Sequence, residues 1–397
     1  MARPNNHKAF RVAFSFALPV ESNACECMFD EVWEDIPNPP GDDHRNRYTF
    51  GRIGDLPVVL AYGGGMGKTR AATVATSLAL NFPDIEVGFL VGICAAVPII
   101  RKGSEIFLGD VVVSTGVIQY DLVRQYQDME ITKDGLNERL ACYRPSMQKF
   151  IHQAQGQWAL HKLLEETAAK TATLGTEKHG KYKPPGPEFD VVFDPKYLHC
   201  HHAPTGCEIC DPKNDVVCDF SRTASCQHLN CDTKENQRLR PGTSVANPQI
   251  HFGVFGSGDR VQKSGAHRDD IGEKHPDIVA FEMEGAGVWE TIPTIIVKAA
   301  CDYGDSHREK RWHPYAAFTA ASCARALILL WGKRDDLPSP ESDGTPVATD
   351  DRFLWNQYAG TFRNHNSPVA NQAFNQNISG GFTIPFNFGA PQGPGER

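Results

Sequence analysis

Residues 57–82 read PVVLAYGGGMGKTRAATVATSLALNF, and this stretch indicates the fold class. The apolar run at residues 57–62 has the length and composition of a buried strand. A glycine-rich turn follows at residues 63–67, and residues 68–82 then carry small and apolar side chains at helical spacing. A strand that passes through a glycine turn into a helix predicts one unit of an α/β sheet.

The same alternation continues along the chain. We expect further buried strands at residues 12–17, 86–92, 107–114, 250–256, 279–285 and 294–302. Residues 314–331 form an apolar run that predicts a largely buried last helix. Because helical segments separate some of the strands, the pattern predicts an α/β fold whose sheet is covered on both faces.

The composition is that of an ordinary globular protein. The 397 residues are 41% hydrophobic and 22% charged, which excludes collagen-like, coiled-coil and wholly disordered classes. The formal net charge of -8 gives no general attraction to nucleic acid or anionic lipid. No apolar run of the ~20 residues that span a bilayer and no export signal is evident. We therefore expect a soluble, cytoplasmic protein without nucleic-acid or membrane partners.

Two regions interrupt the α/β pattern. Residues 165–248 include KHGKYKPPGPEF and a cluster of Cys and His, and they show no helical or strand periodicity, so we interpret them as an insertion. Residues 335–397 are rich in Pro, Gly, Ser and Asn, a composition typical of linkers and tails. We therefore expect one catalytic domain at residues 8–334, with the insertion inside it, followed by a tail.

The insertion contains HCHHAPTGCEICDPKNDVVCDFSRTASCQHLNC at residues 199–231. In a chain without an export signal, such a cluster predicts metal binding rather than disulfides, although free or paired cysteines are the alternative. A CxxC pair is half of a typical zinc site, and four thiolates leave no open position for catalysis. We therefore predict a structural Zn²⁺ held by Cys207, Cys210, Cys226 and Cys231, with Cys218 as an alternative ligand in the second half.

The turn at residues 63–69, GGGMGKT, ends in the same way as a phosphate-binding loop. Tyr62, however, stands where that motif has its first glycine, and no acidic strand that would hold Mg²⁺ is evident. We interpret the turn as one that brings the backbone close to a ligand or to the sheet.

Three acidic residues lie at the ends of predicted strands. Glu282 and Glu284 are two residues apart in FEMEGAGVWE, and Asp302 ends the strand at 294–302. Ligands of α/β sheets bind beyond the carboxyl ends of the strands, and paired carboxylates can divide general-acid catalysis from charge stabilisation. The alternative for the glutamates is an ordinary acidic helix N-terminus.

These residues carry a resemblance to a known family. The segments in question are ALPVE (17–21), GGMGK (64–68), VGICAAVP (91–98), LGD (108–110), GSGD (256–259), FEMEGAG (281–287) and CDYGDSH (301–307). Because these segments occur in this order, the chain resembles the purine and uridine phosphorylase superfamily, which includes nucleosidases. The resemblance is greatest to the fungal members, which often stand at the N-terminus of NACHT-type receptors. The resemblance covers residues 11–333 outside the insertion. It implies a three-layer α/β/α sandwich with a central mixed twisted sheet, and a homodimer or larger oligomer.

The resemblance also implies roles for single residues. Glu284 would accept the ribose 2′ and 3′ hydroxyls, Asp302 would protonate the leaving purine, and Glu21 would orient and deprotonate water. Met283 would pack on the sugar. Other implied substrate-binding residues are Phe281, Glu282, Gly65, Cys94, Ala95, Val261 and Gln262. Cleavage of an N-glycosidic bond needs a proton donor at the base and negative charge near the ribose, which these acids supply.

The expected nucleophile is water. Phosphorylases of this superfamily carry arginines near the first strand end and the central turn, whereas this chain has ALPVES and VGICAAVP there. A phosphate dianion without a guanidinium would lose its strongest contacts. We therefore expect a purine nucleosidase that needs no organic cofactor and releases base and ribose. The alternatives are a phosphorylase, or an effector module of a receptor protein that acts on ATP or other adenine nucleotides.

Overall fold

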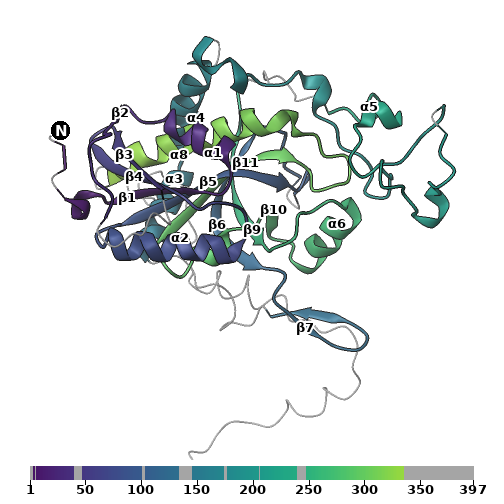
Figure 1. Cartoon of the computed structure of the whole chain (residues 1–397), viewed down its shortest axis with the longest axis horizontal. Coiled ribbons are helices and arrows are strands. Elements are labelled where there is room, and N and C mark those ends of the chain that lie inside the picture. The colour runs from purple at the N-terminus through teal and green to yellow at the C-terminus, as the bar shows by residue number, and fades with distance from the viewer. Residues whose placement is uncertain are drawn as a thin grey trace, which may run out of the picture. The chain divides into compact units, whose positions relative to one another are not determined.

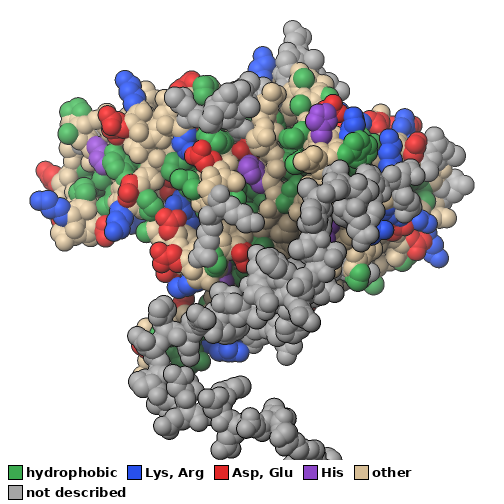
Figure 2. All heavy atoms as spheres, turned by 180° about the vertical axis from the view of Figure 1, so that it is seen from behind, with side chains coloured by type: hydrophobic (Ala, Val, Ile, Leu, Met, Phe, Trp, Pro, Cys, Tyr) green, Lys and Arg blue, Asp and Glu red, His purple; other side chains and the backbone are tan. Residues whose placement is uncertain are grey.

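A computed structural model of the chain describes residues 3–4, 6–39, 47–100, 103–133, 145–173, 177–204, 206–238 and 247–334. The tail expected at residues 335–397 lies outside these residues. On the face shown in Figure 2, acidic and basic side chains are interspersed.

A central mixed sheet is the framework of the fold (Figure 1). Its described strands, in spatial order, are β10 (Ile278–Glu282), β9 (Ile250–Ser257), β6 (Val111–Gln119), β11 (Thr294–Asp302), β5 (Val87–Ala96), β1 (Val12–Phe16), β4 (Leu56–Tyr62), β3 (Arg47–Ile53) and β2 (Glu31–Val32). Strand β5 also pairs with β10, so that β10, β9, β6, β11 and β5 form a closed ring. A separate hairpin consists of β7 (Val123–Gln125) and β8 (Glu130–Thr132).

Helices cover both faces of the sheet. The described α-helices are α1 (Pro19–Glu26), α2 (Lys68–Asn81), α3 (Pro145–Gln155), α4 (Gln157–Ala172), α5 (Cys226–Leu229), α6 (Gly265–Lys274), α7 (Gly285–Val288) and α8 (His313–Trp331). Helix α8 contacts α1, α4, β5 and β11, whereas α2 packs with α7 and β4. Figure 1 shows α1, α4 and α8 above the sheet and α2 below it. The three-layer α/β/α prediction is confirmed.

Helix α8 is the central core helix. Nearly all of its side chains are buried, and many of them are alanines that let the helix lie close to the sheet. The hydroxyl of Thr319 donates to the backbone oxygen of Gly109, which anchors the helix to the turn before β6. By length and composition Lys310–Trp331 could cross a membrane, but 83% of its most apolar window is buried inside the protein, as expected for a core helix.

Several element boundaries differ from the prediction. Strand β10 ends at Glu282, whereas the expected strand extended to residue 285. Residues 165–172 continue helix α4 and are not part of the irregular insertion. Strand β5 extends through the expected turn as far as Ala96, because its end pairs with β10. Strand β6 begins at Val111, because Gly109 has a φ of +89° and the Asp110 carboxylate accepts from the Phe107 N–H, which closes a turn.

The insertion is built mostly from turns and short 3₁₀-helices, which include Glu177–Tyr182, Pro187–Phe189 and Pro212–Asn214. Figure 1 shows it extending beyond the sheet, with α5 in it. Its own buried apolar cluster is small and contains Phe193, Leu229 and Cys231.

Candidate active site

The end of β5 brings the predicted acids together. Ala95 pairs with Asp302 of β11 on one side and with Phe281 of β10 on the other. Glu282 and Glu284 follow directly after Phe281, and Glu21 reaches the same strand from the first turn of α1. The closed ring of strands, rather than one row of parallel strand ends, therefore positions the candidate residues.

Glu21 lies in a cradle of backbone donors. Its Oε2 accepts from the N–H groups of Ala17 (2.9 Å) and Leu18 (2.8 Å), and its Oε1 accepts from the N–H of Ile93 (2.9 Å). A Cβ at Gly92 would lie 2.0 Å from Oε1, so any larger residue there would displace this carboxylate. Burial raises the pKa of Glu21 above its ordinary value, which makes its carboxylate a stronger base.

Glu284 is paired with a buried lysine. The Nζ of Lys298 lies 2.8 Å from Glu284 Oε2, and the two side chains are 1% and 6% exposed. Burial alone would lower the pKa of Lys298, but Glu284, Glu21 and Glu282 together hold it above its ordinary value. Lys298 had no role in the sequence prediction, although a single lysine inside the apolar run TIIVKAACD was the available signal.

Glu282 caps the turn into α7. Its Oε2 accepts from the N–H groups of Glu284 (2.9 Å) and Gly285 (2.8 Å). Burial raises the pKa of Glu282, and the neighbouring Glu284 adds to the shift. Through Oε2, Glu282 therefore fixes the backbone that carries Glu284, whereas its buried Oε1 has no hydrogen-bond partner within the described residues.

Asp302 is held by the loop that follows it. Its Oδ1 accepts from the N–H of Gly304 (2.8 Å), and its Oδ2 accepts from Nε (2.8 Å) and Nη2 (2.7 Å) of Arg308. Arg308 was not predicted, because it lies six residues beyond the strand. A ligand that takes a proton from Oδ2 of Asp302 would have to compete with this guanidinium.

The glycine turn contributes to the site through its backbone. The N–H of Gly67 donates to Glu284 Oε1 at 3.3 Å. The ammonium of Lys68 lies 2.7 Å from both carboxylate oxygens of Asp121, and Asp259 accepts from the Lys68 N–H. The lysine that resembles a phosphate-loop lysine is therefore already paired.

The remaining predicted binding residues differ in position. Gln262 is buried beside the loop that follows Asp302. A Cβ added to Gly304 of this loop would lie 3.2 Å from the Cγ of Gln262 and 3.4 Å from the Cβ of Ala95. The Gln262 Nε2 has no hydrogen-bond partner within the described ranges. Val261 is 45% exposed.

Three further predicted residues lie close to the acids. Met283 is half-buried between Glu282 and Glu284. Burial raises the pKa of Cys94 far above its ordinary value, and Asp302 and Glu282 add to the shift, so its thiol stays neutral. The half-buried Gly65, at a φ of +140°, lies beside the guanidinium of Arg70.

Two cavities reach the carboxylates. Asp302 and Arg308 line a cavity of about 960 Å³, whose other wall is formed by insertion residues that include Tyr197 and Cys226. Glu284 instead borders a small cavity that it shares with Gly63, Gly65 and other residues. The crevice that the sequence predicted at the strand ends is therefore divided into two hollows.

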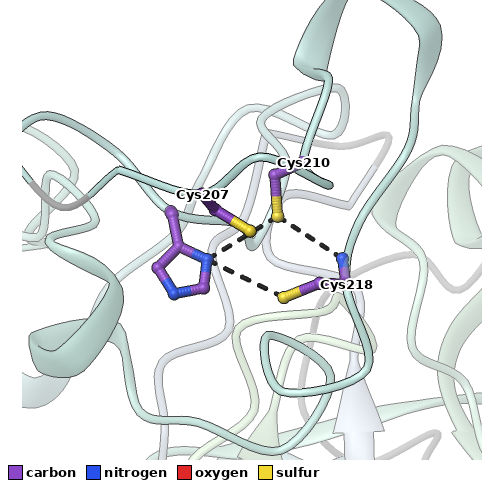
Figure 3. A group of neighbouring side chains, drawn as sticks. Cys207, Cys210 and Cys218 are labelled. Atoms are coloured by element: carbon purple, nitrogen blue, oxygen red, sulfur yellow. Dashed lines mark hydrogen bonds between the residues drawn. The ribbon is translucent and has the colours of Figure 1, made fainter.

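The predicted single four-cysteine site is wrong in its grouping. The structure divides Cys207, Cys210, Cys226 and Cys231 between two groups. One group is His201, Cys207, Cys210 and Cys218, and the other is His199, Cys226 and Cys231. Figure 3 shows the sulfur atoms of Cys207, Cys210 and Cys218 around a common space.

The path of the chain explains this grouping. The turn after Pro212–Asn214, with Asp215 in the left-handed region, returns the chain so that the Cys218 N–H donates to Cys210 Sγ. Cys226 is instead the first residue of helix α5, and Cys231 follows that helix. Every cysteine in the described ranges is a free thiol.

Removal of the Lys298 charge tests the carboxylate cluster. We expect Lys298→Met to lower the free energy of unfolding by about 3–5 kcal/mol, because it leaves buried carboxylates without their cation. Urea unfolding at neutral pH measures this. The exposed Lys333 provides the control, since Lys333→Met should change stability by less than about 0.5 kcal/mol. Equal stability of the two variants would contradict the pairing.

The loop after β11 predicts a pH dependence. Burial raises the pKa of Asp305 to about 6 from 3.8, so between these values the folded protein binds a proton that the unfolded chain does not. Stability from this group therefore increases as the pH falls from 7 to 4, by about 2–3 kcal/mol relative to Asp305→Asn. Urea unfolding of both proteins at several pH values measures the difference, and parallel pH profiles would refute it.

Comparisons with known proteins agree with the resemblance. The chain is 26% identical over 328 residues to a nucleotide-binding leucine-rich repeat (NLR)-like protein of Hyaloscypha variabilis. The match covers 81% of this chain but 29% of that protein, so the chain spans less than a third of its relative's length.

Solved structures of similar fold include the 5'-methylthioadenosine/S-adenosylhomocysteine nucleosidase of Neisseria meningitidis, at 16% identity, a TM-score of 0.46, and coverage of 80% of this chain and 97% of that chain. Another is the futalosine hydrolase of Helicobacter pylori, at 14% identity, a TM-score of 0.44, and coverage of 81% and 98%. Residues 27–182 match the family model described as phosphorylase superfamily.

Proposed function

We propose that the chain is a purine nucleosidase, which cleaves the N-glycosidic bond of a purine nucleoside with water to give free base and ribose. The observation that carries this proposal is the group of buried carboxylates, Glu21, Glu284 and Asp302, around the end of β5. Such a reaction passes through a sugar with the character of an oxocarbenium ion, which a group with excess negative charge stabilises.

Each carboxylate has surroundings that suit one step. Glu284 is fixed by Lys298 and the Gly67 N–H, so it can hold the ribose hydroxyls in one orientation. Glu21 has a raised pKa and fixed oxygens, as a base for water requires. Asp302 lies beside Gln262 and the large cavity, where it would face the departing base.

The charges favour water over phosphate. Among the residues that the structure describes, the two cations that contact the candidate acids are both engaged, since Lys298 pairs with Glu284 and Arg308 pairs with Asp302. Lys68 is likewise paired with Asp121. A phosphate dianion bound here would face several carboxylates and would have to compete with them for these cations.

One alternative has support from a relative. The similarity to part of an NLR-like protein favours an effector module of a receptor, which would act on ATP or other adenine nucleotides through the same site. A phosphorylase is the other alternative. The homodimer or larger oligomer implied by the resemblance is part of the proposal, and light scattering of the purified chain tests it.

Product analysis distinguishes these functions. We expect chromatography of adenosine, inosine or guanosine incubated with the purified chain to show free base and ribose at equal rates with and without phosphate. Base that appears only with phosphate, together with ribose 1-phosphate, would identify a phosphorylase. Base released from ATP but from no nucleoside would favour the effector module, and no base from any of them would refute the proposal.

Asp302 provides the matching test of mechanism. Replacement by Asn keeps the shape but removes the proton donor, so we expect Asp302→Asn to lower kcat by the ~10²–10⁴-fold typical of a lost general acid. The exposed Asp277 provides the control, because Asp277→Asn should retain full activity. An Asp302→Asn variant with normal kcat would remove Asp302 from the mechanism.

Gln262 tests where the base binds. Its buried amide can donate to or accept from a purine edge. We expect Gln262→Leu to raise KM for the preferred purine nucleoside by about 3- to 10-fold, the cost of one hydrogen bond. The exposed neighbour Lys263 provides the control through Lys263→Gln. Equal KM values in all three proteins would place the base elsewhere.

A further inference from the structure

We propose that the insertion binds two zinc ions, and that the second ion braces the loop that carries Asp302. The first ion would lie among His201, Cys207, Cys210 and Cys218. The second would be held by His199, Cys226 and Cys231, next to His307 of the loop. The metal sites stand independently of the proposed function, whereas the effect on catalysis rests on it.

The first group has the geometry of a tetrahedral site. Its four ligand atoms lie within 4.8 Å of one another. His201 Nδ1 is 3.6 Å from Cys210 Sγ and 3.8 Å from Cys218 Sγ. With Zn–S near 2.3 Å and Zn–N near 2.0 Å, the edges of a tetrahedron are about 3.5–3.8 Å long. The imidazole of His201 and the thiols of Cys210 and Cys218 thus already stand at ligand spacing, and the Cys207 thiol lies within 4.8 Å of them.

Backbone and hydroxyl groups form hydrogen bonds with the sulfur atoms of this group. The same kinds of contact surround the thiolates that bind metal ions in proteins. The Cys218 N–H donates to Cys210 Sγ at 3.4 Å, and the N–H of the fully buried Ser221 donates to Cys218 Sγ at 3.4 Å. Such outer contacts orient metal ligands and stabilise their charge. Four protein ligands leave no open position, so this ion would be structural.

The second group includes a buried histidine that needs a partner. His199 is 7% exposed, and neither of its ring nitrogens has a hydrogen-bond partner in the described part of the chain. A buried imidazole without partners costs stability, unless something binds it. The thiols of Cys226 and Cys231 lie within 4.8 Å of a ring nitrogen, so an ion at this point would satisfy His199.

The second site is open, unlike the first. Cys226 and Cys231 line the cavity of about 960 Å³ that also contains Asp302. Three protein ligands leave the fourth position of a tetrahedral ion to water. We therefore expect the second ion to exchange faster and to be removed by a chelator before the first.

His307 connects the second site to the catalytic loop. The ring of His307 stacks on the ring of Phe193, with 3.8 Å between the ring centroids. It meets the ring of His199 edge to face, with 4.9 Å between the ring centroids. The His307 N–H donates to Asp305 within the same loop. An ion that fixes His199 therefore fixes the surface on which His307 rests, and with it the loop between Asp302 and Arg308.

The metal content of the purified full chain tests both sites. We expect two zinc ions per chain by elemental analysis, and one ion in each of Cys210→Ser and Cys226→Ser. Cys27→Ser, outside both groups, should keep two. Titration of wild-type protein with a chelator should release the ions in two phases, which tests the sites even if a variant fails to fold. Fewer than two ions in wild-type protein, or loss of the same ion in both variants, would overturn the proposal.

Hydrogen exchange tests the brace without an activity measurement. We expect Cys226→Ser to accelerate amide exchange in residues 303–308, and Cys210→Ser to leave that segment unchanged. In a nucleosidase assay, Cys226→Ser should also lower kcat more than Cys210→Ser does. Unchanged exchange in a Cys226→Ser protein that has lost its ion would overturn the brace, and would do so whether or not the chain cleaves nucleosides.

Discussion

The candidate site depends on one buried cation. Lys298 lies in the middle of β11, and its charge is balanced by Glu284 in direct contact and by Glu21 and Glu282 nearby. Each buried carboxylate that loses water costs several kcal/mol unless a cation accompanies it. The acids come from α1 and from the end of β10, and the direct Lys298–Glu284 pair links the turn after β10 to the middle of β11.

The same charge balance suits the proposed reaction. One ammonium faces three carboxyl groups, so the ionised carboxylates would carry more negative charge than Lys298 balances. A sugar that becomes positively charged would be attracted by this excess. The interaction would therefore be stronger in the transition state than in the bound substrate, which is the condition for lowering the barrier. A bound phosphate would have the opposite effect on the same groups.

The sequence predicted the strands better than the site. Apolar runs such as the one at residues 294–302 are long and bounded by polar residues, so β11 appears with the expected ends. Lys298 and Arg308 were missed, because a paired charge has no periodic pattern that reveals its partner. The cysteine grouping was wrong for a related reason: spacing along the chain shows which thiols are available, but the turn at Asp215 determines which of them meet.

The insertion raises the question of what gives it a fixed shape. Its buried apolar cluster is small, and a segment with so little apolar burial does not usually offset the entropy of ordering its chain. Part of the order comes from the α/β domain, because the Tyr303 hydroxyl donates to Asp190 at 2.6 Å and Arg238 donates to the same hydroxyl. These contacts lie at one edge of the insertion and do not reach the turns around Cys210 and Cys218.

Small domains with little buried apolar surface are often stabilised by disulfides or metal ions. Since the thiols of the insertion form no disulfides and are grouped with histidines, metal ions are the interaction that fits. The insertion forms the wall of the large cavity opposite Asp302. The order of that wall would then depend on the bound ions.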